Sequence, residues 1–303
     1  MTPTRKLMLF AAMALMMGLT APTGRAQALK PSGIVAVLTD YGTTDFYVGA
    51  LYGAMCRANP AVHIVTITNE IEAYDIHEGA YVLAMAAREF PAGTVFVGVV
   101  DPGVGAGRKC IVLETKSGML FVGPDNGLFT IVARQMGVKS VHEITNRAMM
   151  RPGKTSATFQ GRDVFGPVAA RLAGGANVTQ VGPGLAKMVM LKQTAASRMK
   201  SGVSCGILHT DHYGNIITNV SASLVASAGL RLGRKVKITA GNKTVIAKFV
   251  KTYGDVPVGE WLVAINAEGT LEIARNEADA AKSLGVKAGM PVVVSSVQTG
   301  AKK

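Results

Sequence analysis

Residues Ile34–Thr68 read "IVAVLTDYGTTDFYVGALYGAMCRANPAVHIVTIT" and contain the clearest fold signal of the sequence. The first six of these residues form an apolar, β-branched run typical of a buried strand. Residues 45–58 have the spacing of a helix, and residues 63–68 read as a second strand. The alternation continues with a helix over 75–90 and a strand over 94–100. This order predicts an α/β domain with a mostly parallel sheet flanked by helices.

The remaining sequence predicts a second body of a different kind. Residues 110–115 and 119–123 read as a hairpin or return strand, and two helices over 127–137 and 161–175 complete the first half. A polar stretch punctuated by Gly and Pro follows, and beyond it come short apolar runs spaced like the strands of a small barrel or sandwich. We therefore expect an N-terminal α/β domain over 33–185 and an all-β, barrel-like C-terminal domain over 200–298.

The N-terminus predicts export. Arg5 and Lys6 precede the apolar run Leu7–Leu19, and the following residues end in Gly24 and Ala26. A basic start, an apolar run and small residues at the end are typical of a secretory signal peptide, which we expect over residues 1–26. The apolar run is shorter than the roughly 20 residues that span a bilayer. We expect a periplasmic or secreted protein with no stable membrane anchor after cleavage. A retained N-terminal anchor is the alternative.

Composition narrows the function class. The formal net charge is +13, and removal of residues 1–26, which carry three basic and no acidic residues, leaves +10. The cations are scattered and no basic patch is interleaved with aromatic residues, so we expect no nucleic-acid partner. Cys56, Cys110 and Cys205 are odd in number and lie in apolar segments, which favours buried free thiols. No C-x-x-C spacing suggests a metal, and none is expected.

Carboxylates follow two of the predicted parallel strands. Asp40 ends the first strand, and Asp101 ends the third in "VVDPGVGAGR", residues 99–108. The spacing of glycines in that loop fits neither a dinucleotide nor a P-loop motif. Because the carboxyl ends of parallel strands meet at one edge, the two carboxylates predict a site for a polar substrate. Asp125 and Asp163 are candidates for the same rim, and each of the four is alternatively a turn or cap residue.

A second candidate constellation lies in the all-β half, in "TDHYGNIITN" over residues 210–219. Asp211, Tyr213 and Asn215 offer an acceptor, an aromatic face and an amide in one turn. An aromatic ring beside an amide can stack on and hydrogen-bond a nucleobase, although Asp and Asn are also common in tight turns.

Several blocks in order resemble the S-adenosylmethionine hydroxide adenosyltransferase family, relatives of fluorinating and chlorinating enzymes. The blocks lie between about residues 34 and 296 and read "LTDYGTTDFYVGALYGAM", "YDIHEGAYVLA", "FPAGTVFVGVVDPGVG", "FVGPDNGLFT", "ATFQGRDVFGPVAARLA", "DHYGNIITN" and "LEIARNEADAA". The resemblance implies an α/β domain plus a β-barrel, assembled as a homotrimer with sites between subunits. It also implies displacement of methionine from the 5′ carbon of S-adenosylmethionine by water, with no cofactor.

The resemblance also implies roles for single residues. Asp101 and Arg108 match two members of a water-handling triad, and Asp40 matches the aspartate that grips the ribose hydroxyls. The other substrate-binding positions are expected at Asp45 and Asp211 (methionine portion), Tyr74 and Phe159 (near the sugar), and Tyr213 and Asn215 (adenine).

One triad position departs from the family pattern, because Gln160 stands where the hydroxide-using branch has histidine. A glutamine can hydrogen-bond to water but does not titrate near neutral pH. The leading hypothesis is therefore an exported hydrolase of S-adenosylmethionine that uses Asp101, Arg108 and Gln160. The alternatives are a nucleoside-binding protein that has lost turnover and, more distantly, a transferase that uses a halide.

Overall fold

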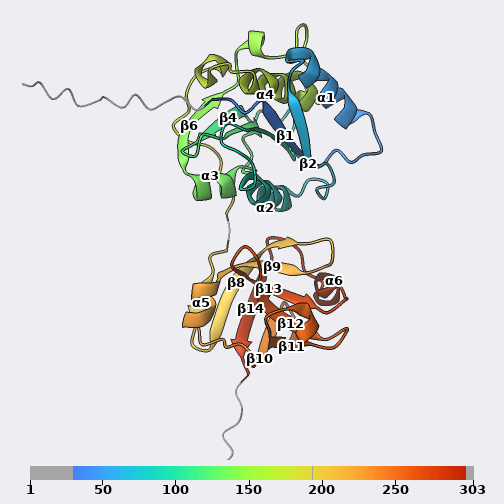
Figure 1. Cartoon of the computed structure of the whole chain (residues 1–303), viewed down its shortest axis with the longest axis vertical. Coiled ribbons are helices and arrows are strands. Elements are labelled where there is room, and N and C mark those ends of the chain that lie inside the picture. The colour runs from blue at the N-terminus through green and yellow to red at the C-terminus, as the bar shows by residue number, and fades with distance from the viewer. Residues whose placement is uncertain (1–29, 193, 298–303) are drawn as a thin grey trace, which may run out of the picture.

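The computed structural model describes residues 30–192 and 194–297, which form two bodies joined by a single connecting segment (Figure 1). The predicted signal peptide lies outside the described residues. None of the helices within the described ranges is long and apolar enough to cross a membrane.

The first body is built on a six-stranded sheet in the order β2-β1-β3-β5-β4-β6. β1 pairs in parallel with β2 and β3, and β3 pairs in parallel with β5, whereas β4 is antiparallel to both of its neighbours. The α/β prediction, with a return strand over 110–115, is confirmed. The strands are β1 Ile34–Thr39, β2 His63–Thr68, β3 Val95–Val99, β4 Cys110–Thr115, β5 Leu120–Pro124 and β6 Val138–Glu143.

Helices cover both faces of this sheet because successive residues of its central strands β1 and β3 are apolar, so that both faces carry apolar side chains. Val35 and Val37 of β1 join one core with Leu51 of α1 and Val168 of α4, while Leu38 joins the other core, which includes α2 and α3. The helices are α1 Tyr47–Ala58, α2 Ile76–Ala87, α3 Thr130–Met136 and α4 Gly166–Ala173. The helix expected over 161–175 begins with a π-helical turn, Gly161–Phe165, before the α-helix.

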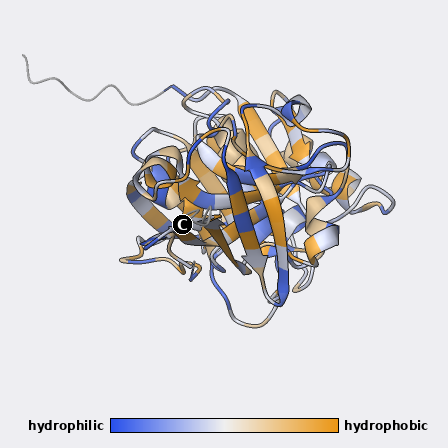
Figure 2. Ribbon diagram, turned by 90° about the horizontal axis from the view of Figure 1, so that it is seen from below, coloured by the Kyte–Doolittle hydropathy of each residue, from blue (hydrophilic) through white to orange (hydrophobic). Residues whose placement is uncertain are grey.

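The second body is a closed barrel rather than a sandwich. Its strands pair in the order β14-β10-β11-β12-β13-β9-β8, and a β14–β8 pairing closes the ring. β7 extends the edge of β8. In Figure 2 hydrophilic and hydrophobic residues alternate along the nearer strands, as the period of a half-buried strand requires. The elements are β7 Ser197–Met199, β8 Gly202–Thr210, β9 Ile216–Ser221, α5 Ala222–Ser227, β10 Lys235–Ala240, β11 Lys243–Phe249, β12 Trp261–Ile265, β13 Thr270–Arg275, α6 Ala280–Leu284 and β14 Pro291–Ser296.

The two bodies meet where α2 packs against β8. Tyr81 of α2 stacks on His209 of β8 with ring centroids 5.1 Å apart, and Ile217 of β9 belongs to the core that α2 and α3 cover. Burial lowers the pKa of His209, so the stacked ring is neutral at pH 7.

Candidate active site

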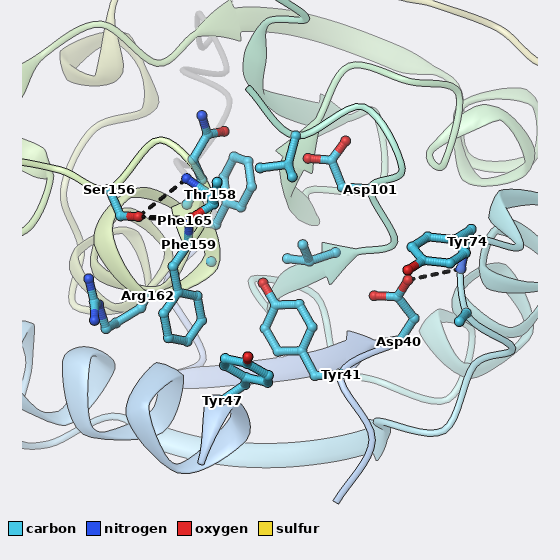
Figure 3. Close-up of a pocket in the computed structure, with 15 residues that line it drawn as sticks. Asp40, Tyr41, Tyr47, Tyr74, Asp101, Ser156, Thr158, Phe159, Arg162 and Phe165 are labelled. Carbon is cyan, nitrogen blue, oxygen red and sulfur yellow. Dashed lines mark hydrogen bonds between the residues drawn. The ribbon is translucent and has the colours of Figure 1, made fainter. Parts of the chain in front are cut away.

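A cavity of about 560 Å³ opens at the carboxyl ends of β1 and β3 (Figure 3). The segment over residues 156–165, which leads into α4, forms its other wall. The volume lies within the roughly 300–1,000 Å³ of small-molecule sites. The cavity brings together five predicted site residues: Asp40, Tyr74, Asp101, Phe159 and Gln160.

Arg108 does not line this cavity itself, but it connects two residues that do, Asp101 and Gln160. Its Nε donates to Asp101 Oδ2 at 2.9 Å, and its Nη2 donates to the same oxygen and to Gln160 Oε1, the latter at 2.5 Å. The loop between Asp101 and Arg108 turns back through Gly105 and Gly107, whose positive φ angles of 80° and 84° suit glycine. The structure therefore joins the three side chains that the sequence predicts as a triad.

The free oxygen of Asp101 is the exceptional feature of this cluster. The side chains of Arg108 and Asp101 are only 12% and 5% exposed. Burial opposes the charged form of Arg108, yet its hydrogen bond with Asp101 keeps the pKa above the ordinary value. Asp101 Oδ1 is buried and has no hydrogen-bond partner among the described residues. A buried carboxylate oxygen without a partner is costly, so this atom is suited to accept from a molecule in the cavity.

Asp40 and Tyr74 lie together on another side of the cavity (Figure 3). The Tyr74 backbone N–H donates to Asp40 Oδ2 at 3.1 Å. Burial raises the pKa of Asp40, and the nearby Asp101 charge also raises it. Tyr74 has a φ of 72°, a strained value for a non-glycine residue, and its ring is 71% exposed. The strain orients a backbone donor toward Asp40 and leaves the ring open to a ligand.

Aromatic rings form the wall opposite Tyr74. Phe159 makes edge contacts with Tyr41 and Tyr47, at centroid distances of 6.0 and 5.4 Å, and the Arg162 guanidinium lies 4.7 Å from its ring centroid. Phe46 extends this cluster and is 68% exposed. The wall offers an apolar face to a sugar or a thioether chain.

The turn predicted to bind adenine lies elsewhere. Asp211, Tyr213 and Asn215 line a second cavity of about 660 Å³ in the barrel, and the two cavities share no lining residue. Tyr213 is 76% exposed. Asp45 is exposed and lines neither cavity. Within one chain, the predicted substrate-binding residues are thus divided between two surfaces.

The carboxylate of Asp211 serves its own turn. Its Oδ1 accepts from the backbone N–H groups of Tyr213 and Asn215 at 3.0 and 2.8 Å, and its Oδ2 accepts from the Asn215 side chain at 2.9 Å. Asp211 is therefore a turn residue in this structure, because its carboxylate fixes the loop that carries Tyr213.

Two further aspartates that the sequence placed at the same rim do not line this cavity. Asp125 accepts from the Val189 backbone N–H at 2.8 Å and lines a different cavity. Asp163 is fully buried, where it pairs with Arg151 and Arg162 and accepts from the Ser156 N–H. Both are structural because their carboxylates anchor neighbouring loops.

Sequence reasoning missed several lining residues. Tyr41 and Tyr47 both follow Asp40 in "DYGTTDFY", and the density of aromatic residues in this stretch could have indicated a binding wall. In the barrel cavity the missed residues are Tyr253 and the run Arg275–Asp279, which includes Glu277 with a φ of 52°. Tyr74 and Glu277 are the non-glycine residues with positive φ within residues 30–192 and 194–297, and each lines one of the two cavities.

The cysteines also differ from expectation. Cys205 is buried as predicted, but Cys56 is exposed and Cys110 is half-buried beside Arg108. In the part of the chain that the structure describes, no three His, Cys, Asp or Glu side chains gather as a metal site.

Comparisons with known proteins agree with this arrangement. Residues 35–182 match the model of the SAM hydroxide adenosyltransferase N-terminal domain, and residues 205–293 match that of its C-terminal domain. The (R)-S-adenosyl-L-methionine hydrolases of Salinispora tropica and Methanocaldococcus jannaschii are each 37% identical, over 86% and 84% of this chain and 97% and 92% of their own lengths.

A solved structure of an uncharacterized conserved protein from Thermotoga maritima superposes with a TM-score of 0.82 at 38% identity, covering 86% of this chain and 99% of that one. The two family models together span most of the chain, and both bodies of the fold are matched in order. The chain belongs to the SAM hydroxide adenosyltransferase family.

Proposed function

We propose that this protein hydrolyses S-adenosyl-L-methionine to adenosine and L-methionine. The observation that carries this proposal is the buried Oδ1 of Asp101, which has no hydrogen-bond partner among the described residues. It belongs to a side chain that lines the cavity and that is fixed by the bond between Asp101 Oδ2 and Arg108. The family membership and the two hydrolase relatives give the substrate class.

The proposed reaction needs little covalent help from the protein. The oxygen of a water molecule bonds to the 5′ carbon while the carbon–sulfur bond breaks, and methionine leaves with that electron pair. The water loses one proton, which Asp101 Oδ1 accepts and passes to solvent. Because the sulfonium is already a good leaving group, the main tasks are to align the water opposite sulfur and to exclude other water.

The other residues of the cavity bind and orient the nucleoside. Asp40 accepts from the two ribose hydroxyls, for which a carboxylate has enough lone pairs. Tyr74 and Phe159, on opposite sides of the cavity, pack against the sugar. Tyr213 and Asn215 contact adenine, and Asp45 and Asp211 lie near the methionine portion in the same proposal. No cofactor is needed.

Because the adenine residues line a separate cavity, we propose that a second copy of the chain supplies them, as part of a homotrimer. The exposed rings of Phe46, Tyr74 and Tyr213 support assembly, since each would be partly covered by a neighbour. Sedimentation of the purified protein tests this point: a trimer is expected, and a monomer that still turns over substrate would contradict it.

Two alternatives use the same cavity. Gln160 cannot titrate near pH 7, which favours a binding protein without turnover as the first alternative. The second is a halide nucleophile, which the Asp101 carboxylate that lines the cavity disfavours by charge repulsion. The proposal also retains export through residues 1–26, for which N-terminal sequencing of the mature protein should begin at Gln27.

The decisive assay is incubation with S-adenosyl-L-methionine followed by chromatography for adenosine and methionine in equal amounts. Asp101→Asn is the control, since it keeps the shape of the side chain and removes the charge. If the wild type forms no more adenosine than this variant, the hydrolase proposal fails. Tight adenosine binding without turnover would then support the binding protein. Formation of a 5′-chloro nucleoside when chloride is added would support the halide reaction.

A further inference from the structure

Cys110 lies behind the proposed triad and contacts two of its members. It is the first residue of β4, which runs antiparallel to β5 and so begins at the sheet edge where β3 ends. Arg108 Nη1 donates to Cys110 Sγ at 3.1 Å, and Cys110 Sγ donates to Gln160 Oε1 at 3.3 Å. Together with the Arg108–Gln160 bond these contacts form a closed triangle of three side chains.

The triangle determines which way the Gln160 amide faces. A guanidinium has only donors, so the atom of Gln160 that faces Arg108 is the oxygen, Oε1. Burial raises the pKa of the Cys110 thiol even though Arg108 lies close, so the thiol keeps its proton and donates to that same oxygen. The two donors occupy both lone pairs of Oε1. The Nε2 group, on the other side of the amide carbon, is left for the cavity that Gln160 lines.

We propose that Cys110 is a positioning residue: it holds Oε1 of Gln160 from behind, so that the amide Nε2 donates to the attacking water. This inference rests on the proposed hydrolase function and deepens it. The water would donate one proton to Asp101 Oδ1 and accept from Gln160 Nε2, which leaves its second lone pair for the 5′ carbon. The Cys110 thiol and the Gln160 amide together thus orient the water, in place of the histidine that the hydroxide-using branch of the family has at position 160.

The contact matters because the bond from Arg108 occupies only one lone pair of Oε1. Arg108 Nη2 uses one N–H for Asp101 Oδ2 and the other for Gln160 Oε1, and a glutamine side chain has several rotatable bonds. Without the thiol, the amide plane can turn about this single bond, and Nε2 then moves out of line with the water. Loss of a single neutral hydrogen bond of this kind changes populations by about 3- to 10-fold.

The kinetic test compares Cys110→Ala and Cys110→Ser with Cys56→Ala, an exposed cysteine on α1, as the matched control. We expect Cys110→Ala to lower kcat about 3- to 10-fold with less than about a twofold change in KM, and Cys110→Ser to restore kcat because a hydroxyl donates to the same oxygen. In a Gln160→Ala background, Cys110→Ala should have no further effect. An equal loss in both backgrounds, or no rescue by serine, would overturn the proposal.

A second measurement needs no turnover and separates this inference from the proposed function. Alkylation of the two thiols by iodoacetamide is followed by peptide mass spectrometry, with Cys56 as the internal reference. Gln160→Ala should raise the alkylation rate of Cys110 several-fold and leave that of Cys56 unchanged. If the rates do not respond, the contact is absent and the inference fails. If Cys110 responds but the wild type forms no adenosine, the contact exists and it is the hydrolase function that fails.

Discussion

The buried carboxylate of Asp163 holds the segment that carries Phe159 and Gln160, so Asp163→Asn should both destabilise the protein and disturb its site. Asp163 is fully buried and accepts from Arg151, from Arg162 and from the Ser156 N–H. The substitution removes the charge that the two guanidinium groups satisfy and replaces an acceptor oxygen with a donor.

The size of the effect follows from the pKa of this group. Burial alone would raise it, but the bonds from Arg162, Ser156 and Arg151 lower it from 3.8 to about 2. At about 1.4 kcal/mol for each pKa unit, the charged form contributes about 2 to 3 kcal/mol to the free energy of unfolding. Because the folded pKa is depressed, this contribution is complete above about pH 4, is lost as the pH falls through about 2, and is about half present at pH 3.

Urea unfolding followed by far-ultraviolet circular dichroism measures this contribution, since the longer helices lie in the first body. At pH 7 the variant should be less stable than wild type by at least about 2 kcal/mol, with the difference smaller at pH 3. Glu143→Gln, which breaks the partly exposed pair with Lys109, is the control and should cost less than about 1 kcal/mol. A loss of stability no larger than that of the control, or one that is the same at pH 3 and pH 7, would show that the charge of Asp163 does not stabilise the fold.

Three further predictions concern the cavity. Gln160→His should raise kcat about 10-fold or more with little change in substrate affinity, and it should add a titration near pH 6.5 to the pH profile of the rate. A fall in affinity at constant kcat would instead make Gln160 a binding residue. Asp40→Asn should weaken adenosine binding about 10-fold in calorimetry, and an unchanged affinity would remove Asp40 from the ribose site. Because burial raises the pKa of Asp40, adenosine binding by the wild type should weaken on acidification already at a pH above 3.8. Tyr74→Gly should raise the free energy of unfolding in urea by up to about 1 kcal/mol, because a φ of 72° strains tyrosine but not glycine, while KM for S-adenosyl-L-methionine rises. A loss of stability would mean that the backbone at Tyr74 is not strained.

The sheet and the main carboxylates could be predicted from sequence because their signals are local. Apolar strand runs that end in Asp40 and Asp101 place both residues at one edge of any parallel sheet, and the structure has them there. The barrel expected for the second body is confirmed, but that expectation rested on the family resemblance. Strand spacing alone could not distinguish a barrel from a sandwich, because closure depends on the β14–β8 pairing between segments about 90 residues apart, which no local pattern encodes.

The site residues that sequence reasoning misplaced depend on three-dimensional neighbours. Asp163 resembles a rim residue in sequence, but it lies within the π-helical turn Gly161–Phe165, and its buried carboxylate pairs with Arg151. Cys110 was expected to be a buried free thiol, and it reaches the triad only because β4 runs antiparallel to its neighbours. Asp211 matches a binding position, yet its oxygens are occupied by its own turn.

Hydrolysis in oxygen-18 water with chloride present is the sharpest test of the proposed function, because it identifies the atom that attacks the 5′ carbon. Wild-type protein should release adenosine with the heavy oxygen at its 5′-hydroxyl, together with an equal amount of methionine, and Asp101→Asn should release at least about 100-fold less. Adenosine without the heavy oxygen, a 5′-chloro nucleoside as the main product, or equal rates for the two proteins would contradict the proposed function.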